Sequence, residues 1–210
     1  GEVPPASPGV QRLHVPVPEA RVKGGRVEGH GQKSAYHRGM RMSFEATLLE
    51  MSRTRLLDDY PSQIAECLAV LTAEDLWWRP HDQANALGNI LLHLAGSNRY
   101  WIGYGVGARP VSRDRAGEFA ARGKGDVLAE WADSLAVCRD VLTSLEPRHL
   151  VETTERTGTP MTVAAILLHA SHHMATHMGQ ILWITKARRP GAVSEVWIRT
   201  RDRLAAARRP

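Results

Sequence analysis

Residues 159–186 read TPMTVAAILLHASHHMATHMGQILWITK, and this stretch predicts a long helix. Its apolar residues recur every three or four positions, the spacing that places side chains on one face of an α-helix. Thr159 is a suitable N-cap and Pro160 a suitable first helical residue, so we expect a helix over about 160–186. The residues expected to face a core include Val163, Ile166, Leu167, Ala170, Met174, Met178, Ile181 and Leu182.

Three further segments show the same helical spacing of apolar residues. They cover about 43–71, 85–106 and 126–145, and Asn85 is a suitable N-cap for the second of them. Pro61 lies inside the first segment. Because proline lacks an N–H group, it should kink that helix or divide it in two. We find no segment with the alternating pattern of a strand, so the sequence predicts an all-α protein built as a four-helix bundle.

The basic charge of the chain lies at its two ends. The formal net charge is +5, but residues 1–39 carry +3 and residues 186–210 carry +6, which leaves −4 for the segment between them. A nucleic-acid groove needs basic residues on the folded domain, so this distribution argues against nucleic-acid binding. We expect a disordered basic leader over 1–41, a bundle over 42–187 and a loose basic tail over 188–210.

The cysteines and the apolar runs bear on the location of the protein. Cys67 and Cys138 are the two cysteines and have no metal-binding spacing, which fits a reducing compartment. No apolar run approaches the roughly 18 residues that a membrane-spanning helix needs, and no secretory signal is visible. We therefore expect a cytoplasmic protein that does not bind or cross a membrane.

Four of the ten histidines fall within nine residues of the last predicted helix. His169, His173 and His177 are spaced four apart and follow one side of it, whereas His172 is turned about 100° away from His173. Two imidazoles one turn apart can both reach a cation that lies about 2.0–2.1 Å from each nitrogen. Unpaired imidazoles beside an apolar core are costly, and neutral imidazole is a common metal ligand. The spacing therefore predicts a metal site that includes His173 and His177.

We expect the third ligand from another helix, and His93 is the candidate. It lies beside the apolar face of the second predicted helix. Taken alone, His93 is better explained as a buried histidine with satisfied hydrogen bonds; together with His173 and His177, it is better explained as a ligand. His169 is a reserve ligand or a hydrogen-bonding partner of the site. Three imidazoles would leave an open position for water or substrate, while a solvated helix face that binds no metal is the alternative.

Beyond this spacing, several motifs resemble the DinB-like superfamily over about residues 43–186. They are NILLHLAGSNRYWI at 89–102, RDR at 113–115 followed by Glu118-Phe119, and the pattern HxxxHxGQI at 173–181. The resemblance is nearest to an uncharacterised subfamily. It implies a four-helix bundle in up-down-down-up order and a divalent metal, often zinc or nickel. It also implies that His93, His173 and His177 hold this metal.

Characterised relatives in that superfamily are transferases or isomerases that use low-molecular-weight thiols such as bacillithiol and mycothiol. The resemblance thus implies a metal-dependent thiol transferase acting on a small-molecule substrate. A metal-dependent hydrolase on the same site, or a bundle that acts only through association, is the alternative. Neither predicted ligand helix places an Asp or Glu near the histidines, which favours thiol transfer over hydrolysis slightly. We also expect a homodimer, because small bundles often pair through apolar faces.

Other polar side chains could bind or orient a ligand. Asn98 and Arg99 follow His93 and could bind a carboxylate or amide of a thiol cofactor, although surface exposure also explains Arg99. Gln180, near His177, could orient the bound ligand or serve in packing. The charged segment 113–118 could form a lid, and a local ion-pair network or a helix N-cap explains it equally well.

Overall fold

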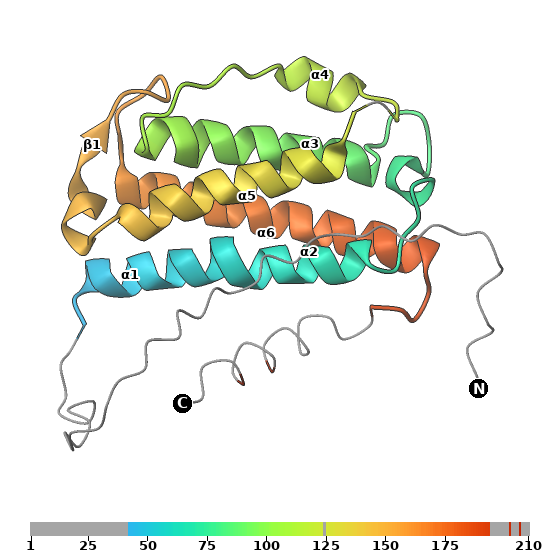
Figure 1. Cartoon of the computed structure of the whole chain (residues 1–210), viewed down its shortest axis with the longest axis horizontal. Coiled ribbons are helices and arrows are strands. Elements are labelled where there is room, and N and C mark those ends of the chain that lie inside the picture. The colour runs from blue at the N-terminus through green and yellow to red at the C-terminus, as the bar shows by residue number, and fades with distance from the viewer. Residues whose placement is uncertain (1–41, 124, 194–201, 203–205, 207–210) are drawn as a thin grey trace, which may run out of the picture.

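The computed structural model describes residues 42–123, 125–193, 202 and 206. The predictions of a disordered leader and of a loose tail therefore fall mostly outside the described residues. Four helical rods form most of the described part, and Figure 1 shows them lying side by side along one axis. The rods are α1 (Phe44–Arg53) with η2 (Thr54–Asp59) and α2 (Tyr60–Leu68); α3 (Leu87–Asn98) with η4 (Arg99–Val106); α5 (Val127–Ser144); and α6 (Val163–Arg188).

The rods run in up-down-down-up order. In Figure 1 the first rod and α6 run from left to right, and α3 and α5 run from right to left. The two parallel rods α3 and α5 require a crossover, and this crossover carries α4 (Arg115–Ala120), which packs along α3. The all-α four-helix bundle is confirmed, and α4 is a short helix between the second and third predicted helices that the sequence did not predict.

The first rod passes through Pro61 without a gap. Its middle segment, η2, is π-helical, and the residues that flank this segment, Arg53 and Tyr60, have ordinary right-handed helical φ and ψ angles. Pro61 is the second residue of α2, directly after the π turns. The interruption expected at this proline is therefore a local change of helical hydrogen bonding, from α to π and back.

Two helices begin later than predicted. The side chain of Thr162, not Thr159, caps α6 by accepting a hydrogen bond from the Ala165 N–H. Pro160 precedes a two-residue strand, β2 (Met161–Thr162), which pairs antiparallel with β1 (Thr153–Thr154). The N-cap position of α3 is Ala86 rather than Asn85. Two short 3-10 helices, η3 (Asp75–Trp77) and η5 (Pro147–Val151), complete the described elements.

One apolar core lies between the four rods. Each rod contributes fully buried aliphatic side chains, among them Leu56, Ile64, Leu91, Leu94, Leu142, Ile166 and Ile181. Both cysteines are buried, and burial raises the pKa of the Cys138 thiol to about 12. Within the described part of the chain, no helix combines the length and the apolar character that crossing a bilayer requires.

Candidate metal centre

Three imidazoles meet between α3 and α6. His93 comes from α3 and is buried, and His173 and His177 come from consecutive turns of α6 and are half-buried. Nε2 of His173 lies 2.9 Å from Nε2 of His93 and 3.1 Å from Nε2 of His177. One nitrogen from each ring falls within a group whose members are all within 4.8 Å of one another. The structure thus brings together the three histidines that the sequence singled out.

Each of these rings has an oxygen atom against its other nitrogen. Nδ1 of His93 lies 2.9 Å from a Glu118 carboxylate oxygen, and Nδ1 of His177 lies 2.7 Å from the Gln180 side-chain carbonyl oxygen. Nδ1 of His173 lies 3.2 Å from the Ser97 hydroxyl. Carboxylate and amide oxygens can only accept, so His93 and His177 carry their protons on Nδ1. Their Nε2 lone pairs therefore point toward the centre of the group.

Glu118 is held in place from two sides. Both of its oxygens accept hydrogen bonds from Arg113, at 2.7 and 3.0 Å, and one of them also accepts from His93. Burial raises the pKa of the Glu118 carboxyl, but the hydrogen bonds from His93 and Arg113 outweigh this effect, so the pKa is lowered overall. The carboxylate is therefore ionised at neutral pH and acts as an acceptor for the His93 ring.

Asn89 fixes the position of α4 against α3. Its side-chain nitrogen donates to the backbone carbonyls of Glu118, Phe119 and Ala121. Its side-chain oxygen accepts from the Ala86 N–H at the start of α3 and from Arg79. The Asn89 side chain is fully buried, and its hydrogen bonds hold the last turn of α4 over the first turns of α3. Glu118 is consequently presented to His93, one helical turn beyond Asn89.

The surroundings of His173 and His177 favour the neutral forms of these two rings. The pKa of His173 is lowered to about 3, mainly by burial and then by the neighbouring His177 and His93 rings. Burial also lowers the pKa of His177, against an opposing hydrogen bond with Gln180. Neutral imidazoles are the form that coordinates a metal ion.

The group fits a divalent cation. Lone pairs of His93 and His177 face the Nε2 atom of His173 at hydrogen-bond distance, so a cation placed between the three rings could be coordinated by one nitrogen of each. Metal–nitrogen distances of about 2.0–2.1 Å in a tetrahedral site place the nitrogens about 3.4 Å apart. The nitrogen pairs His93–His173 and His173–His177, now 2.9 and 3.1 Å apart, would therefore each have to separate by a few tenths of an ångström to accommodate the ion. Three protein nitrogens leave at least one coordination position for another ligand.

A comparison with protein families agrees with this fold and this group of histidines. The family model described as the DinB superfamily matches residues 56–181, which include all three rings. This chain belongs to the DinB superfamily. No curated protein and no solved structure gives a match. The membership confirms the resemblance found in the sequence, and the three-histidine group gives this DinB-superfamily protein a position that could hold a metal ion.

Asn98 and Arg99 bond to α5 rather than to the histidines. The Asn98 side chain is buried and donates to the Ser134 hydroxyl at 3.4 Å, and Arg99 forms an ion pair with Glu130 at 2.6 Å. Asn98 lies five positions after His93, a turn of about 500°, so the two side chains leave α3 in different directions. Contact between either side chain and a thiol cofactor stays a prediction.

His169 and the segment 113–118 take positions that the sequence left open. The His169 ring lies 4.4 Å from the Trp101 ring and stacks on His173 at 6.0 Å, centroid to centroid, so it lines the group without joining it. Arg113 and Glu118 form a local ion pair, and Asp114 caps α4. Sequence reasoning missed the contact of Glu118 with His93. It also missed Ser97, although the spacing of four residues from His93 was a usable signal.

Proposed function

We propose that His93, His173 and His177 bind one divalent cation, zinc or nickel, and that the protein is a transferase that uses a low-molecular-weight thiol. The observation that carries the proposal is the pairing of each Nδ1 with an oxygen atom while the Nε2 atoms converge. Side chains arranged in this way orient imidazole ligands and keep them in the right tautomer. Superfamily membership supports the same reading.

A cation held there would supply a Lewis acid that lowers the pKa of a thiol. The residues around it supply orientation rather than proton transfer. Glu118 is the carboxylate that touches the group, and its oxygens are occupied by Arg113 and His93. A carboxylate with a lowered pKa and occupied oxygens is a weak general base. The weakness of Glu118 as a base favours a reaction in which a bound cation, rather than a side chain, would activate the nucleophile by lowering its pKa.

The metal content of purified variants tests the first half of the proposal. We expect about one equivalent of zinc or nickel per chain, and we expect His93→Ala to lose most of it because two imidazoles from one helix make a weaker site than three. Elemental analysis by mass spectrometry measures this directly. His172→Ala is the control, since His172 is an exposed histidine on the same helix outside the group. Full metal content in His93→Ala would overturn the ligand assignment.

An activity assay tests the second half. The metal-loaded protein is incubated with an electrophilic aryl halide and with bacillithiol, mycothiol or glutathione in turn. We expect at least one thiol to be consumed at a rate that depends on His93. Turnover of an ester or amide without any thiol would instead support a hydrolase. No turnover by a metal-loaded protein in either format would contradict an enzymatic role for this site.

A further inference from the structure

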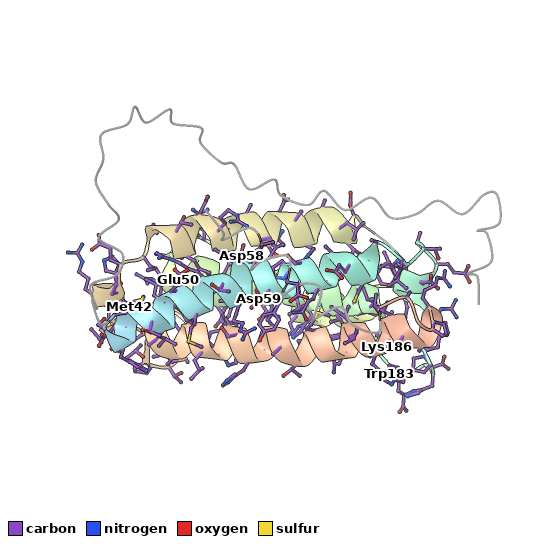
Figure 2. All side chains as sticks on the ribbon, turned by 90° about the horizontal axis from the view of Figure 1, so that it is seen from below. Met42, Glu50, Asp58, Asp59, Trp183 and Lys186 are labelled. Carbon is purple, nitrogen blue, oxygen red and sulfur yellow. The ribbon has the colours of Figure 1, made fainter. Side chains whose placement is uncertain are left out.

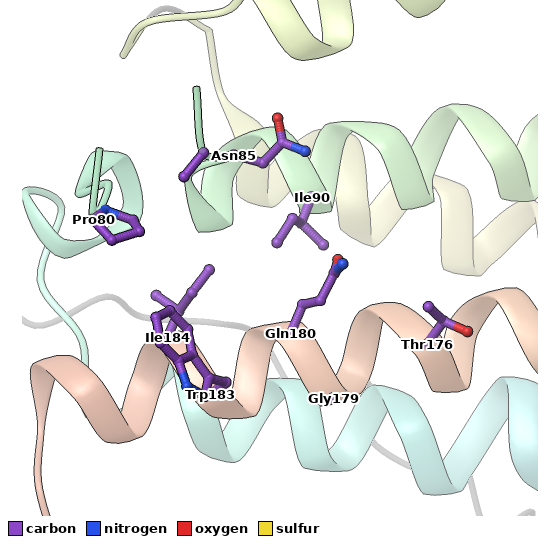
Figure 3. A pocket seen from close by; sticks show the side chains of 9 residues that line it. Pro80, Asn85, Ile90, Thr176, Gly179, Gln180, Trp183 and Ile184 are labelled. Carbon is purple, nitrogen blue, oxygen red and sulfur yellow. The ribbon is translucent and has the colours of Figure 1, made fainter. Parts of the chain in front are cut away.

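A pocket of about 400 Å³ lies between the start of α3 and the C-terminal half of α6. Figure 3 shows Pro80 and Asn85 on one side of it and Trp183 and Ile184 on the other, with Ile90 and Gln180 facing each other across the gap. The volume falls within the roughly 300–1,000 Å³ typical of small-molecule sites.

This pocket adjoins the three-histidine group. Ile90 precedes His93 by three residues, which is about one turn of α3. Thr176 is the residue before His177, and Gln180 touches His177 through its side-chain oxygen at 2.7 Å. The Gln180 amide therefore has one end on a candidate ligand ring and its NH2 group left to donate into the pocket. A molecule bound in the pocket would lie within one helical turn of the histidines on both α3 and α6.

The described residues that line the pocket are all uncharged. Its apolar part includes Ile90, Ile184 and the indole of Trp183, and its polar part includes the amides of Asn85 and Gln180. Trp183 is 58% exposed, and Figure 2 shows it on the outer surface near the C-terminal end of α6. An exposed indole beside aliphatic side chains favours a flat apolar group, and two amides favour a neutral partner that both donates and accepts hydrogen bonds. None of the described lining residues carries a charge, so an ionic group would gain no counter-charge there.

We infer that this pocket binds the uncharged, aromatic or otherwise flat part of the substrate, with its polar group on the amides of Asn85 and Gln180. The statement that the ligand of this pocket is the substrate rests on the proposed function. The pocket itself can be tested without turnover and without a metal. Benzamide is a suitable probe because it is flat and neutral, with an amide that can pair with both side chains.

Gly179 offers a way to fill the pocket without disturbing the fold. It lines the pocket on α6, and a Cβ atom added there would meet no heavy atom within 4 Å. Gly179→Leu should therefore fold and should place its side chain in the space that the probe would occupy. Ala136→Leu is the matched control, because Ala136 is an exposed residue of α5 that does not line the pocket.

Calorimetric titration with benzamide and with benzylammonium measures the occupancy of the pocket. We expect the wild type and Ala136→Leu to bind benzamide with the same affinity. Gly179→Leu should bind benzamide at least about tenfold more weakly than the wild type does. The wild type should bind benzylammonium at least about tenfold more weakly than benzamide. Unchanged benzamide affinity in Gly179→Leu, equal affinity for benzylammonium, or no saturable binding by the wild type would overturn the inference.

The same titration separates this inference from the proposed function. His93 does not line the pocket, so His93→Ala should lose metal while it keeps benzamide binding. Gly179→Leu should keep its metal while it loses benzamide binding. A protein that binds benzamide but takes up no metal would refute the metal proposal and leave the pocket standing. A protein that takes up metal but does not bind benzamide would refute the pocket alone.

Discussion

The contact at Nδ1 of His93 distinguishes a metal site from a simple cluster of histidines better than the position of its Nε2 atom does. Convergent Nε2 atoms can arise wherever histidines are neighbours, but a buried carboxylate at 2.9 Å from Nδ1 requires an additional charged residue in the interior. Burying a carboxylate is costly unless it is paired, and Arg113 supplies the pairing. Glu118 therefore stabilises one tautomer and one orientation of the His93 ring, which a structural histidine would not need.

The effect of Glu118 on metal affinity is the first prediction at this scale. Glu118→Gln keeps the size of the side chain but removes its negative charge. That charge holds Arg113 and increases the basicity of the His93 ring. Substitutions of such orienting groups lower metal affinity by about 10–100-fold. We expect a loss in that range for zinc, measured by competition with a chromophoric chelator.

Glu130→Gln is the control for that experiment. Glu130 forms an ion pair with Arg99 at 2.6 Å, and both side chains are partly exposed to solvent. A surface ion pair contributes about 0–1 kcal/mol, and its loss should leave zinc affinity unchanged. Equal zinc affinity in Glu118→Gln and the wild type would show that the carboxylate only fills space and neutralises Arg113.

Residue spacing explains which part of the site the sequence could predict. His173 and His177 belong to one periodic helix, and His93 lies beside the apolar face of another, so helical periodicity placed them close to the core, and the need for a third ligand and the family resemblance joined them. Glu118 lies 25 residues after His93 in a six-residue helix, where no periodic pattern shows which way a side chain points. Its partner could be found only from the tertiary packing of α4 on α3.

At the scale of elements, α4 comes very close to α3 at Gly96. A Cβ atom on Gly96 would collide with a carboxylate oxygen of Glu118 and would lie 3.0 Å from Nε of Arg113. Both of these atoms belong to the ion pair that supports His93. The absence of a side chain at this position of α3 is what lets α4 bring Glu118 within hydrogen-bond distance of the ring.

Gly96→Ala should therefore displace the ion pair or the whole of α4. Overpacking at a tight contact costs about 1–3 kcal/mol, and here the cost falls on the link between α4 and His93. We expect faster amide hydrogen exchange in α4 and about tenfold weaker zinc binding. Gly179→Ala is the matched control, since its added methyl group has no neighbour and should leave both properties unchanged. Unaltered exchange in Gly96→Ala would show that α4 does not depend on this close approach.

The sequence predicted the four rods but not α4 or the π-helical turns. Each rod is long enough for several apolar residues to repeat on one face, and burial of that face determines the helix. α4 has six residues, which is too short to be stable without tertiary contacts such as those from Asn89. The π turns of η2 and η4 differ from α-helix by hydrogen-bond register, and the spacing of apolar residues does not reveal that difference over so few residues.

At the scale of the whole molecule, one buried carboxylate ties the end of α6 to the link between the first two rods. Asp75 is fully buried and forms ion pairs with Arg188, at 2.7 Å, and with Arg189. It also accepts hydrogen bonds from the backbone and the hydroxyl of Thr72. The guanidinium of Arg188 lies 5.3 Å from the centre of the Trp78 ring. These contacts hold the C-terminal end of the last rod beside the pocket that Trp183 lines.

The pKa of Asp75 connects this contact to pH. Burial raises the pKa, but the hydrogen bonds from Thr72 and Arg188 and the charge of Arg189 outweigh burial, so the folded-state pKa is lowered. A carboxyl with a lowered folded-state pKa stabilises the fold fully above its unfolded pKa of about 3.9. This stabilisation is lost as the pH falls below that value and through the folded-state pKa.

Asp75→Asn should therefore lower the free energy of unfolding by about 2–3 kcal/mol at pH 7, because hydrogen bonds to charged groups are lost in a buried site. The difference from the wild type should shrink as the pH falls below about 3.9, where the wild-type carboxyl also becomes protonated. Urea denaturation at a series of pH values measures both quantities. Asp140→Asn, which removes an exposed ion pair with Arg109, should change stability by less than about 1 kcal/mol at every pH. If the loss of unfolding free energy in Asp75→Asn does not vary with pH, Asp75 stabilises the molecule by shape and neutral hydrogen bonding. Its charge would then contribute nothing to holding α6 in place.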